Sequence, residues 1–168
     1  MYADRWVRFH SLPGSKRYPE SADEYGIVLE RYNTVLDELF TGLEVFVVTM
    51  DWSYTPTGPA GHGTPRQELH PDSVLWWTES NQDDTDPEFH THTRLYADRR
   101  QWRHGCVDNL LRAVADEALV EVFITDTELR RVHHPYDGGA DVIAATPDER
   151  DALRDRHAAW LSGHPAGL

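Results

Sequence analysis

The sequence predicts a single α+β domain over residues 1–168, with three helices packed on a mixed or mainly antiparallel sheet of five to seven strands. Amphipathic segments of helical periodicity alternate with short runs rich in β-branched residues, which indicates mixed secondary structure. The connections between the middle strands are tight, and this favours antiparallel pairing with helices laid against the sheet. A chain of 168 residues without a repeat or a linker suits one domain with its own core.

A strand and the best-marked helix of the chain come first. Residues 5–10 alternate polar and apolar side chains, as a strand with one buried face does. Ser21 and Glu24 have the spacing of a capping box, and an apolar stripe of about four turns follows them. Gly42 is placed to end that helix in the left-handed conformation. Residues 43–49 are almost wholly apolar, so we expect a strand covered on both faces and central in the sheet.

The rest of the chain predicts a long loop, further strands and two more helices. Residues 53–71 are rich in Gly, Pro, Thr and His, and a loop of that length in a compact domain is usually functional or mobile. Strands are expected at 74–78, 89–96, 119–125, 132–136 and 140–143. Gly138 and Gly139 predict a primed turn between the last two strands. The remaining helices are expected over 106–118 and from the Thr146 cap to Gly163.

The net charge of −13, from 16 basic and 29 acidic side chains, limits the classes of partner. Such a surface repels nucleic acid and anionic membranes, so we expect neither as a partner, whereas a basic protein fits it. The apolar runs are far too short to cross a membrane, and no apolar leader precedes the first strand. The single cysteine, Cys106, suits a reducing compartment. We therefore expect a cytoplasmic protein.

The single lysine lies in the densest polar cluster near the start of the chain. A strand end, a glycine, hydroxyl groups and two adjacent cations can together form an anion-binding nest. The hypothesis places an anionic small molecule against His10, Ser11, Lys16, Arg17 and Tyr18, with Arg31 reaching round from the first helix. The alternative is that Lys16 and Arg17 pair with Glu20, Asp23 or Glu24 and only anchor the entrance to the helix.

Two histidines on the expected fourth strand form a second candidate site. His90 and His92 alternate along the strand and therefore share one face, and His62 or His70 from the long loop would supply a third metal ligand. Arg94 continues the same face, where its charge would oppose a cation. A solvated strand face is thus the favoured interpretation. A metal cofactor stays open but is not favoured, and no other cofactor is indicated.

Tryptophans are expected in the core. Trp76, Trp77 and Trp160 are large enough to dominate it, and only an exposed pair would indicate stacking on a ligand.

Two motifs, RFHSLPGSKRYP over residues 8–19 and HPYDGGADVI over residues 134–143, resemble those of an uncharacterised family of small stand-alone proteins from GC-rich bacteria. That family is one of the domains of unknown function. The resemblance covers most of the chain and is weakest between residues 53 and 87. It implies a bacterial cytosolic protein and carries no catalytic assignment.

Three functional hypotheses follow, and the first is favoured. The small size, strong acidity and lack of a known catalytic signature indicate a protein-binding or regulatory module of the immunity type, which covers a basic partner. The second hypothesis is a small enzyme or binding protein for an anionic metabolite, with its site in the loop from His10 to Tyr18. The third is a metal-binding protein centred on His90 and His92. The sequence does not decide whether the protein is an enzyme.

Overall fold

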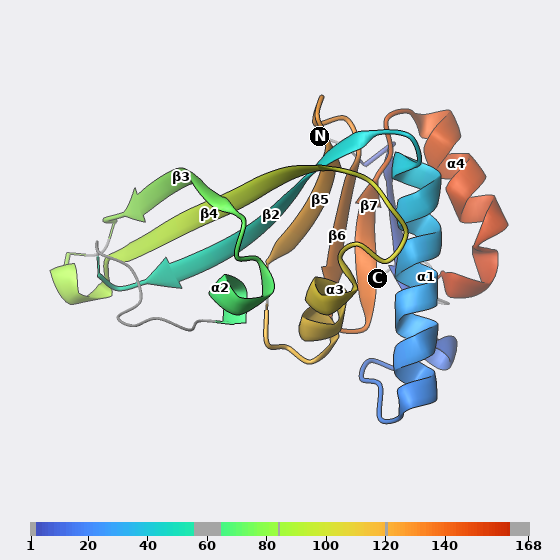
Figure 1. Cartoon of the computed structure of the whole chain (residues 1–168), viewed down its shortest axis with the longest axis horizontal. Coiled ribbons are helices and arrows are strands. Elements are labelled where there is room, and N and C mark those ends of the chain that lie inside the picture. Colours follow the sequence, from blue (N-terminus) through green and yellow to red (C-terminus); the bar gives the residue numbers. More distant parts are fainter. Residues whose placement is uncertain (1–2, 56–64, 84, 120, 162–168) are drawn as a thin grey trace.

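The computed structural model describes residues 3–55, 65–83, 85–119 and 121–161. The strands of this part of the chain form one seven-stranded sheet in the order β1-β7-β6-β5-β2-β4-β3, and every pairing is antiparallel (Figure 1). The α+β prediction is confirmed. The strands are β1 (Trp6–His10), β2 (Glu44–Ser53), β3 (Val74–Asn81), β4 (Thr91–Gln101), β5 (Val122–Asp126), β6 (Val132–Tyr136) and β7 (Gly139–Ile143).

The three predicted helices are present, and a short fourth one lies in the segment predicted as a loop. They are α1 (Ala22–Phe40), α2 (Pro65–Leu69), α3 (Asp108–Ala115) and α4 (Pro147–Arg156), with 3-10 turns at Pro13–Ser15, Pro87–Phe89 and Ala158–Trp160. Both predicted N-caps form: Ser21 Oγ accepts from the Glu24 N–H at 3.3 Å, and Thr146 Oγ1 accepts from the Glu149 N–H at 3.1 Å.

The core lies between the sheet and α1, α3 and α4, which cover one of its faces (Figure 1). β2 is inside the sheet, between β5 and β4, as its apolar sequence predicted. Val45 and Val47 on its helix side are fully buried, but Phe46 on the other side is partly exposed. The expectation of cover on both faces is met only in part: Val48 on that side is buried, but no described helix lies there. We call it the open face.

β3 and the outer ends of β2 and β4 (residues 50–53 and 91–96) extend beyond β5 as an arm (Figure 1). α2 is fixed to the arm by buried polar contacts. The Arg66 guanidinium pairs with Asp51 at 2.6 Å and lies over the Tyr96 ring at 3.7 Å. His70 Nδ1 lies 2.9 Å from the Thr49 hydroxyl, and burial lowers the pKa of the imidazole, which keeps it neutral.

The hairpin between β6 and β7 forms as predicted, but its turn is not a primed one. Within this turn only Gly138 has a positive φ, at +91°, as the third residue of a type II turn does. The φ of Asp137, the residue before it, is not positive. Gly139 already belongs to β7 and is needed for a different reason. A Cβ there would lie 2.5 Å from the Phe9 carbonyl oxygen of β1, so this glycine permits the close approach of the two strands.

Candidate functional site

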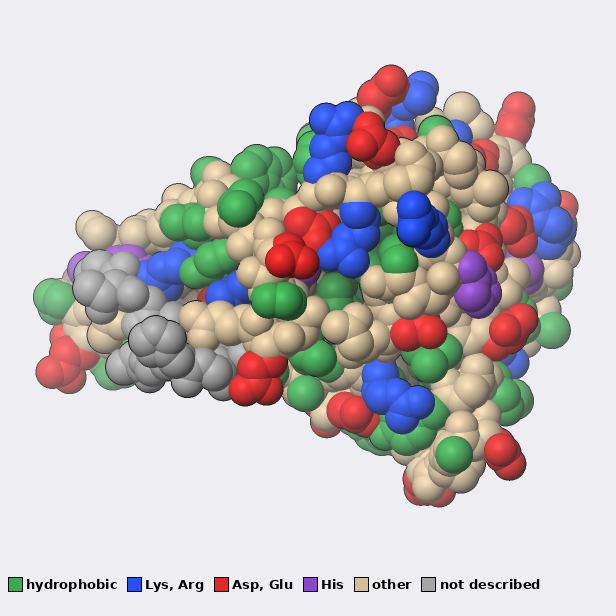
Figure 2. All heavy atoms as spheres, viewed as in Figure 1, with side chains coloured by type: hydrophobic (Ala, Val, Ile, Leu, Met, Phe, Trp, Pro, Cys, Tyr) green, Lys and Arg blue, Asp and Glu red, His purple; other side chains and the backbone are tan. Residues whose placement is uncertain are grey.

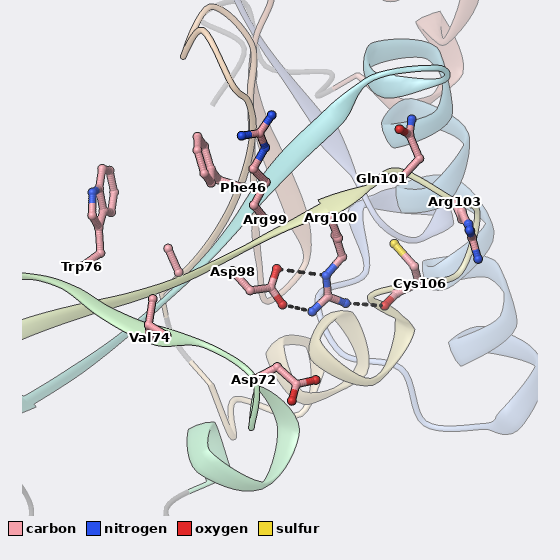
Figure 3. Close-up of a pocket in the computed structure, with 11 residues that line it drawn as sticks. Phe46, Asp72, Val74, Trp76, Asp98, Arg99, Arg100, Gln101, Arg103 and Cys106 are labelled. Carbon is pink, nitrogen blue, oxygen red and sulfur yellow. Dashed lines mark hydrogen bonds and ion pairs between the residues drawn. The ribbon is translucent and has the colours of Figure 1, made fainter.

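A groove of about 800 Å³ lies along the outer edge of β4. β3 pairs with β4 only as far as Val74↔Ala97, because the chain enters β3 from α2 at that point (Figure 3). β4 continues to Gln101 with β2 on its other side. Both faces of the sheet edge supply the lining, which consists of Phe46, Asp72, Val74, Trp76, Ala97, Asp98, Arg99, Arg100, Gln101, Arg103 and Cys106.

Backbone groups of two groove residues lack a partner strand. The Trp102 N–H donates to the Leu43 carbonyl across the β2–β4 ladder at 3.0 Å, and the register of that ladder is unbroken over its ten residue pairs. In such a ladder the backbone groups of successive residues point to alternate sides of the strand. The N–H and C=O groups of Arg99 and Gln101 therefore point away from β2 into the groove, where no described strand receives them.

Most charges of the groove are already neutralised within the chain. The Asp98 carboxylate pairs with Arg100 and lies 3.1 Å from His70 Nε2, and Arg99 pairs with Glu44. Asp72 and Arg103 have no ion pair among the residues that the structure describes, and both are exposed. Figure 3 shows these two side chains on opposite sides of the groove, so the groove has an anionic and a cationic end.

Exposed apolar side chains gather on the arm beside the groove. Figure 2 shows hydrophobic side chains over β3, whose eight residues are all exposed. The group consists of Trp52, Tyr54, Val74, Leu75, Trp76 and Trp77, and we call it the aromatic rim. Trp76 is 56% exposed and Trp77 47%, so the prediction that they dominate the core is wrong. The reason is that β3 is the terminal strand of an arm that extends beyond the helices. Trp160 does pack against the core.

Only two of the six side chains predicted to bind an anion lie together in a hollow. His10 and Arg17 line a space of about 220 Å³ between the first strand and the β6–β7 turn, and Arg17 pairs there with Asp137. Ser11 is buried, and Tyr18 is exposed. Arg31 lies against the core and donates to the His10 carbonyl oxygen at 2.8 Å.

Lys16 lies outside that hollow. Its ammonium group donates to Glu24 at 2.7 Å and to Glu20 at 3.0 Å, and these hydrogen bonds raise the pKa of the amine. Glu24 in turn accepts from the Glu20 N–H at 2.6 Å. These contacts join the loop to the first turn of α1, which is the alternative role considered for this residue. Its binding of an external anion stays a prediction.

The predicted histidine pair lies at the start of β4 in the arm. His92 is 7% exposed, and its Nδ1 lies 2.7 Å from the Ser80 hydroxyl; Arg94 is buried too and donates to Ser53 Oγ at 3.0 Å. The expectation of a solvated strand face is therefore wrong. Among the described residues no three histidine, cysteine or acidic side chains are grouped to hold a metal. His62, one of the proposed third ligands, lies outside the described residues.

The comparisons with known proteins define the family and no activity. The chain belongs to DUF3885, a family described as a domain of unknown function, which matches residues 1–165. This agrees with the resemblance seen in the two sequence motifs. Neither a curated protein nor a solved structure matched the chain. No described helix has the length and apolar character needed to span a membrane.

Sequence reasoning missed the groove altogether. The segment from Asp98 to Gln101 lies beyond the predicted end of its strand, and Cys106 reads as a packed side chain at the start of a helix. One signal was present. Two consecutive tryptophans on a strand have side chains on opposite faces unless a bulge intervenes, so both fit a core only if both faces are covered. The register shift between Leu75 and Trp77 is such an irregularity.

Proposed function

We propose that the protein is a protein-binding module, and that the aromatic rim with the adjoining groove is its interface. The observation that carries this proposal is the exposure of six large apolar side chains on one arm, two of them adjacent tryptophans. So many exposed large apolar side chains on one part of a protein are uncommon if it acts alone, and tryptophan and tyrosine are enriched where interfaces gain most of their binding energy.

The charge distribution favours a basic partner. The tip of the arm has exposed acidic side chains at Glu79, Asp83, Asp86 and Glu88, and the whole chain has a net charge of −13. Such a field accelerates encounter with a cationic protein and orients it toward the arm. A regulatory module of the immunity type, which covers a basic partner in the cytoplasm, agrees with this arrangement.

The alternative sites have less support. In the loop from His10 to Tyr18, the ammonium of Lys16 and the guanidinium of Arg17 are occupied by Glu24 and Asp137, so an anionic metabolite would have to displace carboxylates of the chain itself. The metal hypothesis needs at least one ligand beyond His90 and His92.

Site-specific photo-crosslinking in cells of the source organism tests the proposal. A photoreactive phenylalanine derivative is placed at Trp77, and at Ile27 on the exposed side of α1 as a matched control. We expect one discrete crosslinked product of a different protein from position 77 and none from position 27. A product with twice the mass of the chain would identify a second copy as the occupant and contradict a separate partner. The absence of any product specific to position 77 would contradict the proposal as a whole.

A further inference from the structure

We infer that the groove binds an extended segment of the partner as an added strand, paired antiparallel to β4 at Arg99 and Gln101. This inference rests on the proposed function and specifies how the partner is bound. It starts from the backbone, because unpaired N–H and C=O groups at a sheet edge can be satisfied by an added chain. Two residues of β4 offer two donors and two acceptors in this position.

The groove has room for side chains on both faces of an added strand. A strand alternates its side chains between the two faces of a sheet. Figure 3 shows Phe46, Trp76 and Arg99 on one side of β4, and Asp98, Arg100 and Cys106 on the other. Apolar side chains of the segment would contact Phe46, Val74 and Trp76, all of which line the groove.

The direction of the added strand follows from the sheet and from the two unpaired charges. All six pairings in the sheet are antiparallel, including the one that β3 makes along the same edge of β4. An antiparallel segment would have its N-terminal end near Arg103 and its C-terminal end near Asp72 and Val74. We therefore assign an acidic side chain to its first position and a basic one to its last.

Other charges of the groove do not disturb this assignment. Asp98 and Arg100 pair with each other, and the Arg100 guanidinium also donates to the Cys106 carbonyl oxygen at 3.3 Å. Because burial lowers the pKa of His70, the imidazole beside Asp98 is neutral and adds no charge. Among the described groove residues, the charged side chains without an ion pair are Asp72 and Arg103, and Asp72 also interacts electrostatically with Arg100.

Two hexapeptides of identical composition test both the strand pairing and its direction. Acetyl-Glu-Val-Thr-Val-Thr-Lys-amide places its charges as the inference requires, and acetyl-Lys-Val-Thr-Val-Thr-Glu-amide reverses them. Binding to the full chain is followed by the backbone amide resonances in solution. We expect the first peptide to bind roughly 5- to 10-fold more tightly than the reversed one. This is the difference in affinity expected when two exposed charge contacts change from repulsive to attractive. Slower amide exchange is expected at Arg99 and Gln101, with no change at Arg100, whose amide already faces β2.

Variants and modified peptides make the result specific. Arg103→Glu should remove the preference between the peptides, whereas Arg154→Glu, the same charge change on α4, should keep it. Two further versions of the first peptide are N-methylated, one at both valines and the other at both threonines. Only alternate amides of an added strand face β4, and methylation removes the N–H donor. One version should therefore lose binding, and the other should retain it.

Four outcomes would overturn the inference: no binding of either hexapeptide at millimolar concentration, a preference for the reversed peptide, equal binding of both methylated forms, or a preference that survives Arg103→Glu. Each of these is distinguishable from failure of the proposed function, because the crosslink from Trp77 would persist if only the groove were wrongly assigned.

Discussion

Replacing His133 with leucine is expected to make the protein markedly more resistant to acid. His133 is fully buried on β6, its ring packs edge-on against Tyr32 with 5.7 Å between centroids, and neither ring nitrogen has a hydrogen-bond partner among the described residues. Burial, and to a lesser extent the neighbouring His134, lowers the pKa of His133 to about 3. The native state therefore holds this imidazole neutral.

The sign of the effect follows from the two states. Above a pH of about 6.5, His133 is neutral in both the folded and the unfolded chain and does not affect the pH dependence. Below that pH His133 is protonated in the unfolded chain but stays neutral in the folded chain. The free energy of unfolding therefore decreases as the pH falls towards 3. Because one pKa unit corresponds to about 1.4 kcal/mol, the loss at pH 4 is on the order of 3 kcal/mol.

Urea unfolding at pH 7 and pH 4 measures this loss. Between pH 7 and pH 4, the free energy of unfolding of His133→Leu should decrease by about 3 kcal/mol less than that of the natural chain. The control is His134→Leu, which removes the adjacent imidazole from the open face, where it is half-buried and lies 3.2 Å from Glu121. If His133→Leu and the natural chain lost the same free energy on acidification, the buried neutral imidazole would not be the cause.

Gly139→Ala is expected to destabilise the sheet where β1 joins β7. The new Cβ would lie 2.5 Å from the Phe9 carbonyl oxygen, and a backbone oxygen in a sheet cannot move aside as a flexible side chain can. β1 would therefore have to shift. A second contact at this position is also at risk, because the Gly139 carbonyl oxygen accepts a hydrogen bond from the buried Tyr32 hydroxyl at 2.8 Å. Overpacking of this kind costs on the order of 1–3 kcal/mol.

The matched control for this substitution is Gly26→Ala. Gly26 lies inside α1, and a Cβ there would meet no atom within 4 Å. Alanine at that position should stabilise the helix by about 0.5–1 kcal/mol, because it restricts the unfolded chain and suits a helix. Thermal unfolding of the two variants at neutral pH should therefore shift in opposite directions. A Gly139→Ala protein as stable as the natural one would show that β1 and β7 do not approach so closely.

Local signals in the sequence predicted the elements of the fold well. The caps at Ser21 and Thr146 and the stripe of α1 depend on residues within a few positions of one another, so they can be recognised from spacing alone. The hairpin at Asp137 and Gly138 was found for the same reason. Its turn type was not, because the position of Gly139 is fixed by contact with β1, far away in the sequence.

The candidate site could not be predicted, because it results from a mismatch in strand lengths. The groove exists because β3 begins opposite Ala97 while β4 continues to Gln101, and that register depends on long-range pairing. For Lys16 the sequence left two roles open, an anion site and an anchor for the helix entrance. Its rarity drew attention to it, but its amine lies on two carboxylates within eight residues. The exposure of Trp76 and Trp77 likewise depends on where the helices end, which periodicity does not reveal.

Amide hydrogen exchange in the free protein tests most directly the claim that the edge of β4 is open. Residues of one strand, with similar side-chain types, provide the comparison. We expect the amides of Asp98 and Arg100, which face β2, to exchange slowly. The amides of Arg99 and Gln101 should exchange roughly 100-fold faster or more, since none of the described strands pairs with them on that side. Equal protection at all four positions would mean that the chain already covers this edge, and would contradict a binding site there.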